Sequence, residues 1–236
     1  MKTVIELLKI AYTLVLLPTV IILTIVIGLT AITISFFSKR VAHYFEKLYF
    51  NCILTVTFTK VNVEGIENIE NTKNYVVISN HQSAFDIVTL SAKLPLRIVW
   101  VSKESVFKIP IIGQFMKSMG YISIPREKIR ESINAVKEGS KKINGSPTIF
   151  PEGTRSSDGR LQKFKKGFLI IAENTGLDIL PVVIKGTINI MRKGSLVVTP
   201  FVNVSLKILP PIRNDYVIGN PNILEELYSL YISNLS

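Results

Sequence analysis

The chain has 236 residues, a length that fits one globular domain with an appendage. Its net charge of +11 favours an anionic partner, such as a nucleic acid, a membrane surface or a phosphorylated substrate. The single cysteine, Cys52, excludes an intrachain disulfide framework and favours a reducing compartment.

A long apolar segment lies near the N-terminus. Residues 10–38 carry no charge, and basic residues stand on both sides of them. As a helix, these residues would reach roughly 43 Å, well beyond a hydrocarbon core of about 30 Å. Two architectures fit: one long tilted helix, or two shorter helices immersed from one side with a bend near Pro18 or Gly28. A cleaved signal peptide is disfavoured, because the stretch is too long and no small-x-small site follows it. We predict a membrane anchor over residues 1–38 and a folded domain over residues 39–236.

The remainder of the chain alternates between helical and strand patterns. Residues 41–49 have apolar side chains at helical spacing, which indicates a helix that lies at the membrane interface or docks on the domain. Strands are predicted at 54–61, 74–79, 97–101, 148–150, 179–185, 196–200 and 202–209. Helices are predicted at 87–94, 110–119, 127–143, 165–174 and 224–232. This order predicts an α/β fold, with a mixed central sheet flanked by helices.

A histidine and a carboxylate follow the strand at 74–79. The segment Asn80-His81-Gln82-Ser83-Ala84-Phe85-Asp86 places His81 five residues before Asp86. Histidine is the usual general base near neutral pH, and an aspartate can hold its ring in the useful tautomer. No Gly-x-Ser-x-Gly elbow accompanies the pair, so the nucleophile would come from the substrate. Ser83 and Asp86 also fit a capping box at the start of a helix, and the two interpretations are compatible.

A second polar block follows the strand at 148–150. In Phe150-Pro151-Glu152-Gly153-Thr154-Arg155-Ser156, a tight turn presents a glutamate and an arginine. The planar guanidinium suits bidentate phosphate binding. Two further blocks are Gly120-Tyr121-Ile122-Ser123-Ile124-Pro125-Arg126 and the apolar, proline-containing run at 179–184.

At these four blocks the chain resembles the bacterial lysophosphatidic acid acyltransferase family, within the glycerolipid acyltransferases. The blocks are NHxxxxD at 80–86, GxxxxxR at 120–126, FPEGTRS at 150–156 and the apolar strand at 180–184, in the family's order. The resemblance spans roughly residues 75–185, and it implies a glycerolipid acyltransferase-like fold with an N-terminal helical membrane anchor.

The resemblance also implies roles for individual residues. His81 would be the general base, Asp86 would orient it, and the substrate phosphate would lie on Arg126, Arg155 and Lys103. The residues that would shape the site are Asn80, Glu152, Gly153 and Thr154. From the sequence alone, Arg126 could instead be a solvated strand end, and Arg155 could pair with Glu152 or Asp158.

The implied reaction moves an acyl chain to the 2-hydroxyl of 1-acyl-glycerol-3-phosphate, making phosphatidic acid for phospholipid synthesis. The donor would be acyl carrier protein thioester or acyl-CoA as co-substrate, with no metal or other cofactor. The expected location is the cytoplasmic face of the cell membrane, with the lipid bilayer and lysophosphatidic acid as partners.

Three alternatives stay open at this point. One is acyl transfer to another lysolipid or to glycerol 3-phosphate, and another is a lipid hydrolase that uses His81 and Asp86 on water. The third is a non-catalytic, basic membrane-surface protein, although this leaves FPEGTRS unexplained. Nucleic-acid binding is not expected, because the chain has the charge but no recognisable module.

Overall fold

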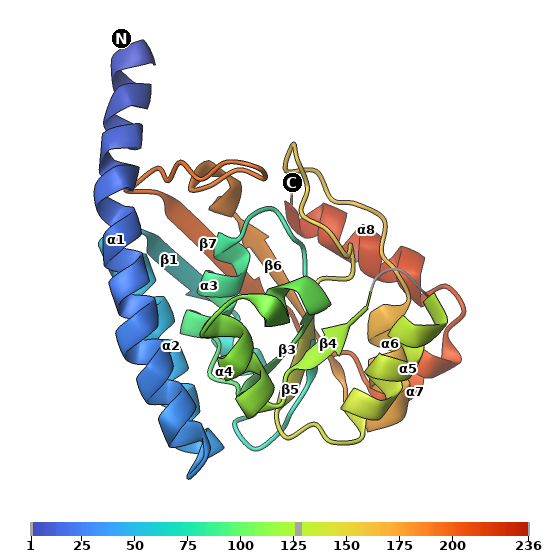
Figure 1. Cartoon of the computed structure of the whole chain (residues 1–236). Coiled ribbons are helices and arrows are strands. Elements are labelled where there is room, and N and C mark those ends of the chain that lie inside the picture. The colour runs from blue at the N-terminus through green and yellow to red at the C-terminus, as the bar shows by residue number, and fades with distance from the viewer. Residues whose placement is uncertain (1, 126–128, 236) are drawn as a thin grey trace.

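Helices and strands alternate along the chain after an N-terminal pair of helices (Figure 1). The computed structural model describes residues 2–125 and 129–235. The α-helices are α1 (Lys2–Ser35), α2 (Lys39–Val56), α3 (Phe85–Lys93), α4 (Ile112–Met119), α5 (Ile129–Ser140), α6 (Gly167–Thr175), α7 (Asn214–Gly219) and α8 (Ile223–Leu235). The strands are β1 (Lys60–Glu64), β2 (Val76–Ser79), β3 (Ile98–Lys103), β4 (Ile122–Ile124), β5 (Ser146–Ile149), β6 (Ile179–Lys185) and β7 (Asn203–Ile208). Short 3₁₀ helices are η1 (Ile66–Asn68), η2 (Glu104–Lys108) and η3 (Thr187–Asn189).

The described strands form one sheet in the order β1-β7-β6-β2-β5-β3-β4. Strands β6 and β7 pair antiparallel, and the other neighbouring pairs are parallel. The predicted fold class, a mixed sheet flanked by helices, is therefore confirmed. Because β2, β3, β4, β5 and β6 run in one direction, the segments that follow them gather at one edge of the sheet, where open α/β sheets bind ligands.

Each face of the sheet carries its own hydrophobic core. Along β2, Val77 packs into one core, while Val76 and Ile78 pack into the other, as the two-residue period of a strand requires. The first core includes side chains of α1, α2, α3 and α4, and the second includes side chains of α5, α6, α7 and α8. Figure 1 shows these helices on the two sides of the sheet.

Helices α1 and α2 form an antiparallel pair along one side of the domain (Figure 1). Helix α1 runs through both Pro18 and Gly28 as one element, so of the two architectures that the sequence left open the structure has the single long helix. A Cβ atom on Gly28 would lie 2.6 Å from Cγ2 of Ile111, so this glycine permits close packing next to α4. By length and composition alone, the segment Thr3–Ser35 could cross a membrane, and its most apolar part is only 11% buried.

The strand predicted at 54–61 is wrong over most of its length, because α2 continues to Val56 and β1 starts at Lys60. Side-chain hydroxyls bind the last carbonyls of the helix. The Tyr12 hydroxyl donates to the carbonyl oxygen of Val56, and the Thr57 hydroxyl donates to the carbonyl oxygen of Ile53. Packing against α1 and α3 thus overrides the β propensity of this stretch.

The strand predicted at 196–200 is also wrong, since these residues form a loop. The backbone N–H of Val198 donates to the Thr13 hydroxyl on α1 at 3.0 Å, and the N–H of Thr199 donates to the Ile190 carbonyl oxygen at 2.8 Å. The loop therefore closes on itself and on the anchor helix instead of pairing with the sheet.

Candidate active site

The turn that carries His81 is fixed to the sheet by Asn80. The amide of Asn80 donates to the carbonyl oxygen of Ile184 and accepts from the Ile184 N–H, both at 2.8 Å. This pair of bonds continues the β2–β6 ladder one step past the end of β2. The backbone at His81 therefore leaves the carboxyl edge of the sheet in a fixed direction.

Asp86 lies in the first turn of α3 and is fully buried. Its Oδ2 atom accepts from Nδ1 of His81 at 2.8 Å, and also from the backbone N–H groups of Gln82 and Ser83. Its Oδ1 atom accepts from the hydroxyl of Thr187 at 2.5 Å. The carboxylate thus binds the turn before α3 and the imidazole at the same time. Of the predicted capping box only the bond from the Ser83 N–H to Asp86 is formed, because α3 has Ala84 as its N-cap, which makes no side-chain cap bond.

The imidazole of His81 is held in one orientation. Its ring stacks on Phe150 with centroids 3.7 Å apart and planes 4° apart. Because Asp86 accepts the proton on Nδ1, the neutral ring carries its lone pair on Nε2. Nε2 has no hydrogen-bond partner among the described residues, and the side chain keeps 13% of its surface exposed. The arrangement is that of a general base open to an incoming hydroxyl.

Glu152 joins the FPEGTRS loop to the histidine turn. Its two carboxylate oxygens accept from the backbone N–H groups of His81, at 2.6 Å, and Gln162, at 2.9 Å. Ser156 adds a second link, because its N–H donates to the His81 carbonyl oxygen at 2.8 Å. Burial raises the pKa of Glu152 to about 7, although the two backbone hydrogen bonds oppose this shift. The carboxylate therefore acts on the backbone of the site, and in the described part of the chain it forms no hydrogen bond with the imidazole ring.

The turn after Glu152 requires its glycine. Gly153 has a φ of 72°, which non-glycine residues rarely adopt, and a Cβ atom there would lie 3.1 Å from Nζ of Lys165. Beside it, the carbonyl oxygen of Thr154 accepts from Nε2 of Gln162 at 3.2 Å. These contacts set the backbone from which Arg155 extends.

Two of the predicted phosphate-binding residues, Arg155 and Lys103, lie at the same edge of the sheet. Arg155 is half-buried, and its guanidinium forms no ion pair with Glu152 or Asp158 in the described part of the chain. Lys103 is the last residue of β3 and pairs in register with Ile124 of β4. Arg126 lies outside the described residues.

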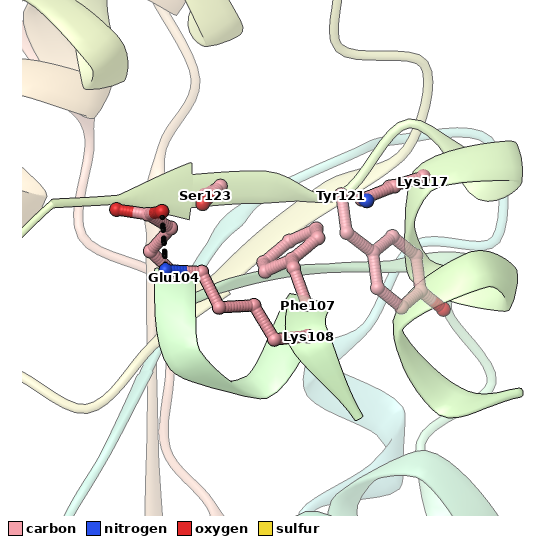
Figure 2. Close-up of a pocket in the computed structure, with 6 residues that line it drawn as sticks. All are labelled: Glu104, Phe107, Lys108, Lys117, Tyr121 and Ser123. Carbon is pink, nitrogen blue, oxygen red and sulfur yellow. Dashed lines mark ion pairs between the residues drawn. The ribbon is translucent and has the colours of Figure 1, made fainter. Parts of the chain in front are cut away.

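A cavity of about 350 Å³ lies between η2, α4 and β4 (Figure 2). Its lining residues are Glu104, Phe107, Lys108, Lys117, Tyr121 and Ser123. Figure 2 shows the rings of Phe107 and Tyr121 on one side and the Glu104–Lys108 ion pair, 3.0 Å long, on another. His81 and Asp86 are not among the lining residues, so we assign the cavity no part in the chemistry.

Two residues of the site were not predicted. Phe150 lies within FPEGTRS, and its aromatic ring directly after a strand was a usable signal for stacking on the histidine. Thr187 lies in η3, 101 residues after Asp86, and a threonine behind an apolar strand gives no specific signal in the sequence.

The sequence that forms this site matches a known protein family. The family model described as Acyltransferase matches residues 60–185, which include all of the predicted site residues. The chain belongs to the acyltransferase family.

Among individual proteins, the chain is similar to acyltransferases from plants and bacteria. The chain is 38% identical over 180 residues to the chloroplastic 1-acyl-sn-glycerol-3-phosphate acyltransferase LPAT1 of Arabidopsis thaliana, covering 75% of this chain and 50% of that protein. It is 33% identical over 177 residues to the 1-acyl-sn-glycerol-3-phosphate acyltransferase of Helicobacter pylori, covering 74% of each. The chain therefore spans about half the length of the plant relative and three quarters of the bacterial one.

A solved structure extends the likeness to the whole chain. The crystal structure of the 1-acyl-sn-glycerophosphate acyltransferase PlsC from Thermotoga maritima superposes with a TM-score of 0.79 at 27% identity. The match covers 99% of this chain and 96% of that one, so it includes the N-terminal helices as well as the sheet.

Proposed function

We propose that this chain is a 1-acylglycerol-3-phosphate O-acyltransferase, which forms phosphatidic acid for phospholipid synthesis. The observation that carries the proposal is the His81–Asp86 pair, in which Nδ1 is bound at 2.8 Å and Nε2 has no hydrogen-bond partner within residues 2–125 and 129–235. The names of the relatives in plants and bacteria support the choice of acceptor.

The proposed reaction is a direct transfer. Nε2 of His81 takes the proton of the acceptor's 2-hydroxyl while that oxygen attacks the thioester carbonyl carbon. The new C–O ester bond forms, the C–S bond breaks, and the imidazolium returns its proton to the leaving thiolate. Asp86 holds the ring and stabilises the imidazolium, and it stays ionised throughout. The donor is acyl carrier protein thioester or acyl-CoA, and no other cofactor enters the scheme.

The acceptor's phosphate is assigned to Arg126, Arg155 and Lys103. Arg155 supports this assignment because its guanidinium has no carboxylate partner among the described residues and extends from the loop that Glu152 ties to His81. A planar guanidinium binds a phosphate with two parallel hydrogen bonds. The anchor is assigned to residues 1–38, which would hold the domain of residues 39–236 at the cytoplasmic face of the membrane.

The experiment that tests the proposal measures acyl transfer to 1-acyl-glycerol-3-phosphate in detergent, from acyl-CoA and from acyl carrier protein thioester in parallel. Phosphatidic acid formed by the wild type, and lost in His81→Ala, is the expected result. Thermal unfolding of His81→Ala in the same detergent shows whether the loss of product occurs in folded protein.

Two results would overturn the proposal. Release of free fatty acid without diacyl product would assign the His–Asp pair to hydrolysis. No product from either donor, with folded protein, would exclude this acceptor, and other lysolipids and glycerol 3-phosphate would then be tried.

A further inference from the structure

We propose that the segment of residues 187–202, together with Phe58, is a second bilayer contact, separate from α1, that seats anionic lipid headgroups beside the His81 site. The proposal deepens the proposed function and rests on its membrane location. Its test reads membrane insertion directly and does not depend on turnover.

An exposed aromatic pair marks this surface. The rings of Phe58 and Phe201 stack with centroids 4.7 Å apart and planes 19° apart. Phe201 keeps 73% of its surface exposed, Phe58 keeps 52%, and Leu196 on the same segment keeps 74%. Large apolar side chains that are exposed to water gain free energy when a bilayer covers them.

The backbone at this pair is strained. Phe58 has a φ of 51° and Phe201 a φ of 61°, values that bulky side chains rarely adopt. Hydrogen bonds hold both turns: the Phe58 N–H donates to the Thr55 carbonyl oxygen at 3.0 Å, and the Phe201 N–H donates to the Thr57 carbonyl oxygen at 3.3 Å. Glycine or asparagine would form the same turns with less strain, so the backbone conformation does not explain why phenylalanine is present at both positions. Strain of this kind is found at functional positions.

At one end, the segment is bound to the candidate active site. Thr187 donates to Asp86 at 2.5 Å, and the carbonyl oxygen of Met191 accepts from the Ser83 hydroxyl at 2.7 Å. Further along, Nζ of Lys193 donates to the carbonyl oxygen of Arg155 at 2.9 Å. A lipid surface that touches this segment would therefore lie next to the catalytic pair.

At its other end, the segment is bound to the predicted anchor. Val198 and Thr13 share hydrogen bonds, which place this loop against α1. Figure 1 shows the N-terminal turns of α1 projecting past the same end of the domain along which the orange loop runs. Residues 3–8 in those turns are all exposed. A bilayer that receives these turns would meet the 187–202 segment.

The chemistry of the surface favours a bilayer over a protein partner. The exposed cations Arg192 and Lys193 precede Leu196, a pattern suited to anionic headgroups with acyl chains behind them. Three apolar side chains are too small a patch for a stable protein interface, which buries roughly 1,200 Å² or more. Beside α1, which would already insert into the bilayer, the same three side chains are enough to form an additional lipid contact.

The first experiment measures insertion with the full chain and vesicles of phosphatidylcholine and phosphatidylglycerol. Phe201→Trp adds a tryptophan to the buried Trp100, and Ile218→Trp on α7 is the matched control at the opposite end of the molecule in Figure 1. We expect brominated phosphatidylcholine to quench the added emission of Phe201→Trp, and to leave Ile218→Trp and the wild type unchanged. Flotation of each protein with the vesicles is measured in the same samples.

A second experiment uses the double variant Phe58→Asn/Phe201→Asn, in which asparagine tolerates the left-handed backbone. We expect its apparent KM for vesicle-embedded acceptor to rise about tenfold. Turnover of a short-chain acceptor dispersed in water stays unchanged. The control Ile218→Asn behaves as the wild type on both substrates.

The proposal is overturned by unquenched Phe201→Trp emission in a chain that floats, or by a chain that does not float at all. A concentration-dependent dimer that the double variant loses would assign the rings to a second copy instead. Quenching in a protein that makes no phosphatidic acid would support this surface while refuting the proposed function.

Discussion

The Thr187 hydroxyl donates a 2.5 Å hydrogen bond to Oδ1 of Asp86, while Oδ2 of the same carboxylate accepts from Nδ1 of His81. The bond joins η3, which follows β6, to the first turn of α3. Both partners are fully buried, so the bond is made in a region of low dielectric where hydrogen bonds to charged groups are strong. It fixes the rotation of the carboxylate and hence the direction of the imidazole.

Thr187→Val should therefore lower kcat about tenfold with little change in acceptor KM, because one hydrogen bond to a charged group is worth roughly 1.5–3 kcal/mol. Thr187→Ser keeps the hydroxyl and should restore kcat. A purely structural role would lower the melting temperature of both variants without this split. Steady-state kinetics and thermal unfolding of the two variants decide between these roles.

His81→Ala and Asp86→Asn should each reduce turnover about a thousandfold, the scale of general-base catalysis. In Asp86→Asn the neutral amide no longer stabilises the imidazolium, and an NH2 group that faces Nδ1 of His81 would move the ring proton to Nε2. Asp158→Asn is the control, because that carboxylate is exposed and bonds only near the loop surface. Activity within tenfold of the wild type in either catalytic variant would refute the mechanism.

The stability of the protein should depend on pH through Glu152. Its pKa is raised from 4.5 to about 7 in the folded state, so the folded protein binds more protons than the unfolded chain between these values. The contribution of Glu152 to the free energy of unfolding is therefore complete below about pH 4.5, and falls as pH rises to 7 and above. After allowance for solvent screening, the loss is about 2 kcal/mol.

Urea unfolding at pH 5 and pH 8, in the wild type and Glu152→Gln, measures this effect. The variant should be less stable at pH 5, because a glutamine has one carbonyl oxygen for two backbone donors. It should also show a smaller difference between the two pH values. Equal pH dependence in both proteins would mean that Glu152 does not titrate in this range.

Arg155→Ala should raise the acceptor's apparent KM roughly 10–100-fold, since a bidentate guanidinium–phosphate pair is lost. Arg155→Lys should recover part of this, because the charge stays and the planar fork does not. Arg160→Ala is the matched control, since its side chain is 89% exposed and pairs with Asp158. An unchanged KM in Arg155→Ala would move the phosphate site elsewhere.

The sheet and most helices could be predicted because their apolar residues follow the period of the element. The strand predicted at 179–185 matches β6 at both ends, and the helix predicted before Gly120 ends at that residue with a left-handed φ of 79°. The stretches at 54–61 and 196–200 failed because bonds to α1, through Tyr12 and Thr13, decide their backbone. A contact between segments this far apart leaves no local periodic signal.

For the site, too, prediction from sequence succeeded only where the residues lie in local motifs. His81, Asp86 and Glu152 are recognisable because they lie within short motifs, and the structure brings them together through bonds at 2.6 Å and 2.8 Å. Thr187 and Phe58 belong to no recognisable motif. Their roles follow from their neighbours in the fold, Asp86 for Thr187 and Phe201 for Phe58. Local sequence thus indicates the residues that carry the chemistry, and the tertiary structure supplies those that orient it.

The exposed apolar face of α1 should be the part of this helix that enters the bilayer. Val15 and Ile22 are 72% and 61% exposed, so charging them disturbs no packing, whereas deletion of residues 1–38 would uncover the buried side chains of α2 that α1 covers. Val15→Asp/Ile22→Asp should leave the melting temperature in detergent unchanged. Binding to phosphatidylcholine and phosphatidylglycerol vesicles should fall more than about 100-fold, because an aspartate at membrane depth costs roughly 2.5–3.5 kcal/mol. Ile232→Asp on α8 is the control, since it replaces an exposed apolar residue away from the anchor. Vesicle flotation equal to the wild type would show that this face of α1 does not enter the bilayer, and the domain would then reach its lipid substrate through other surfaces, such as the 187–202 segment.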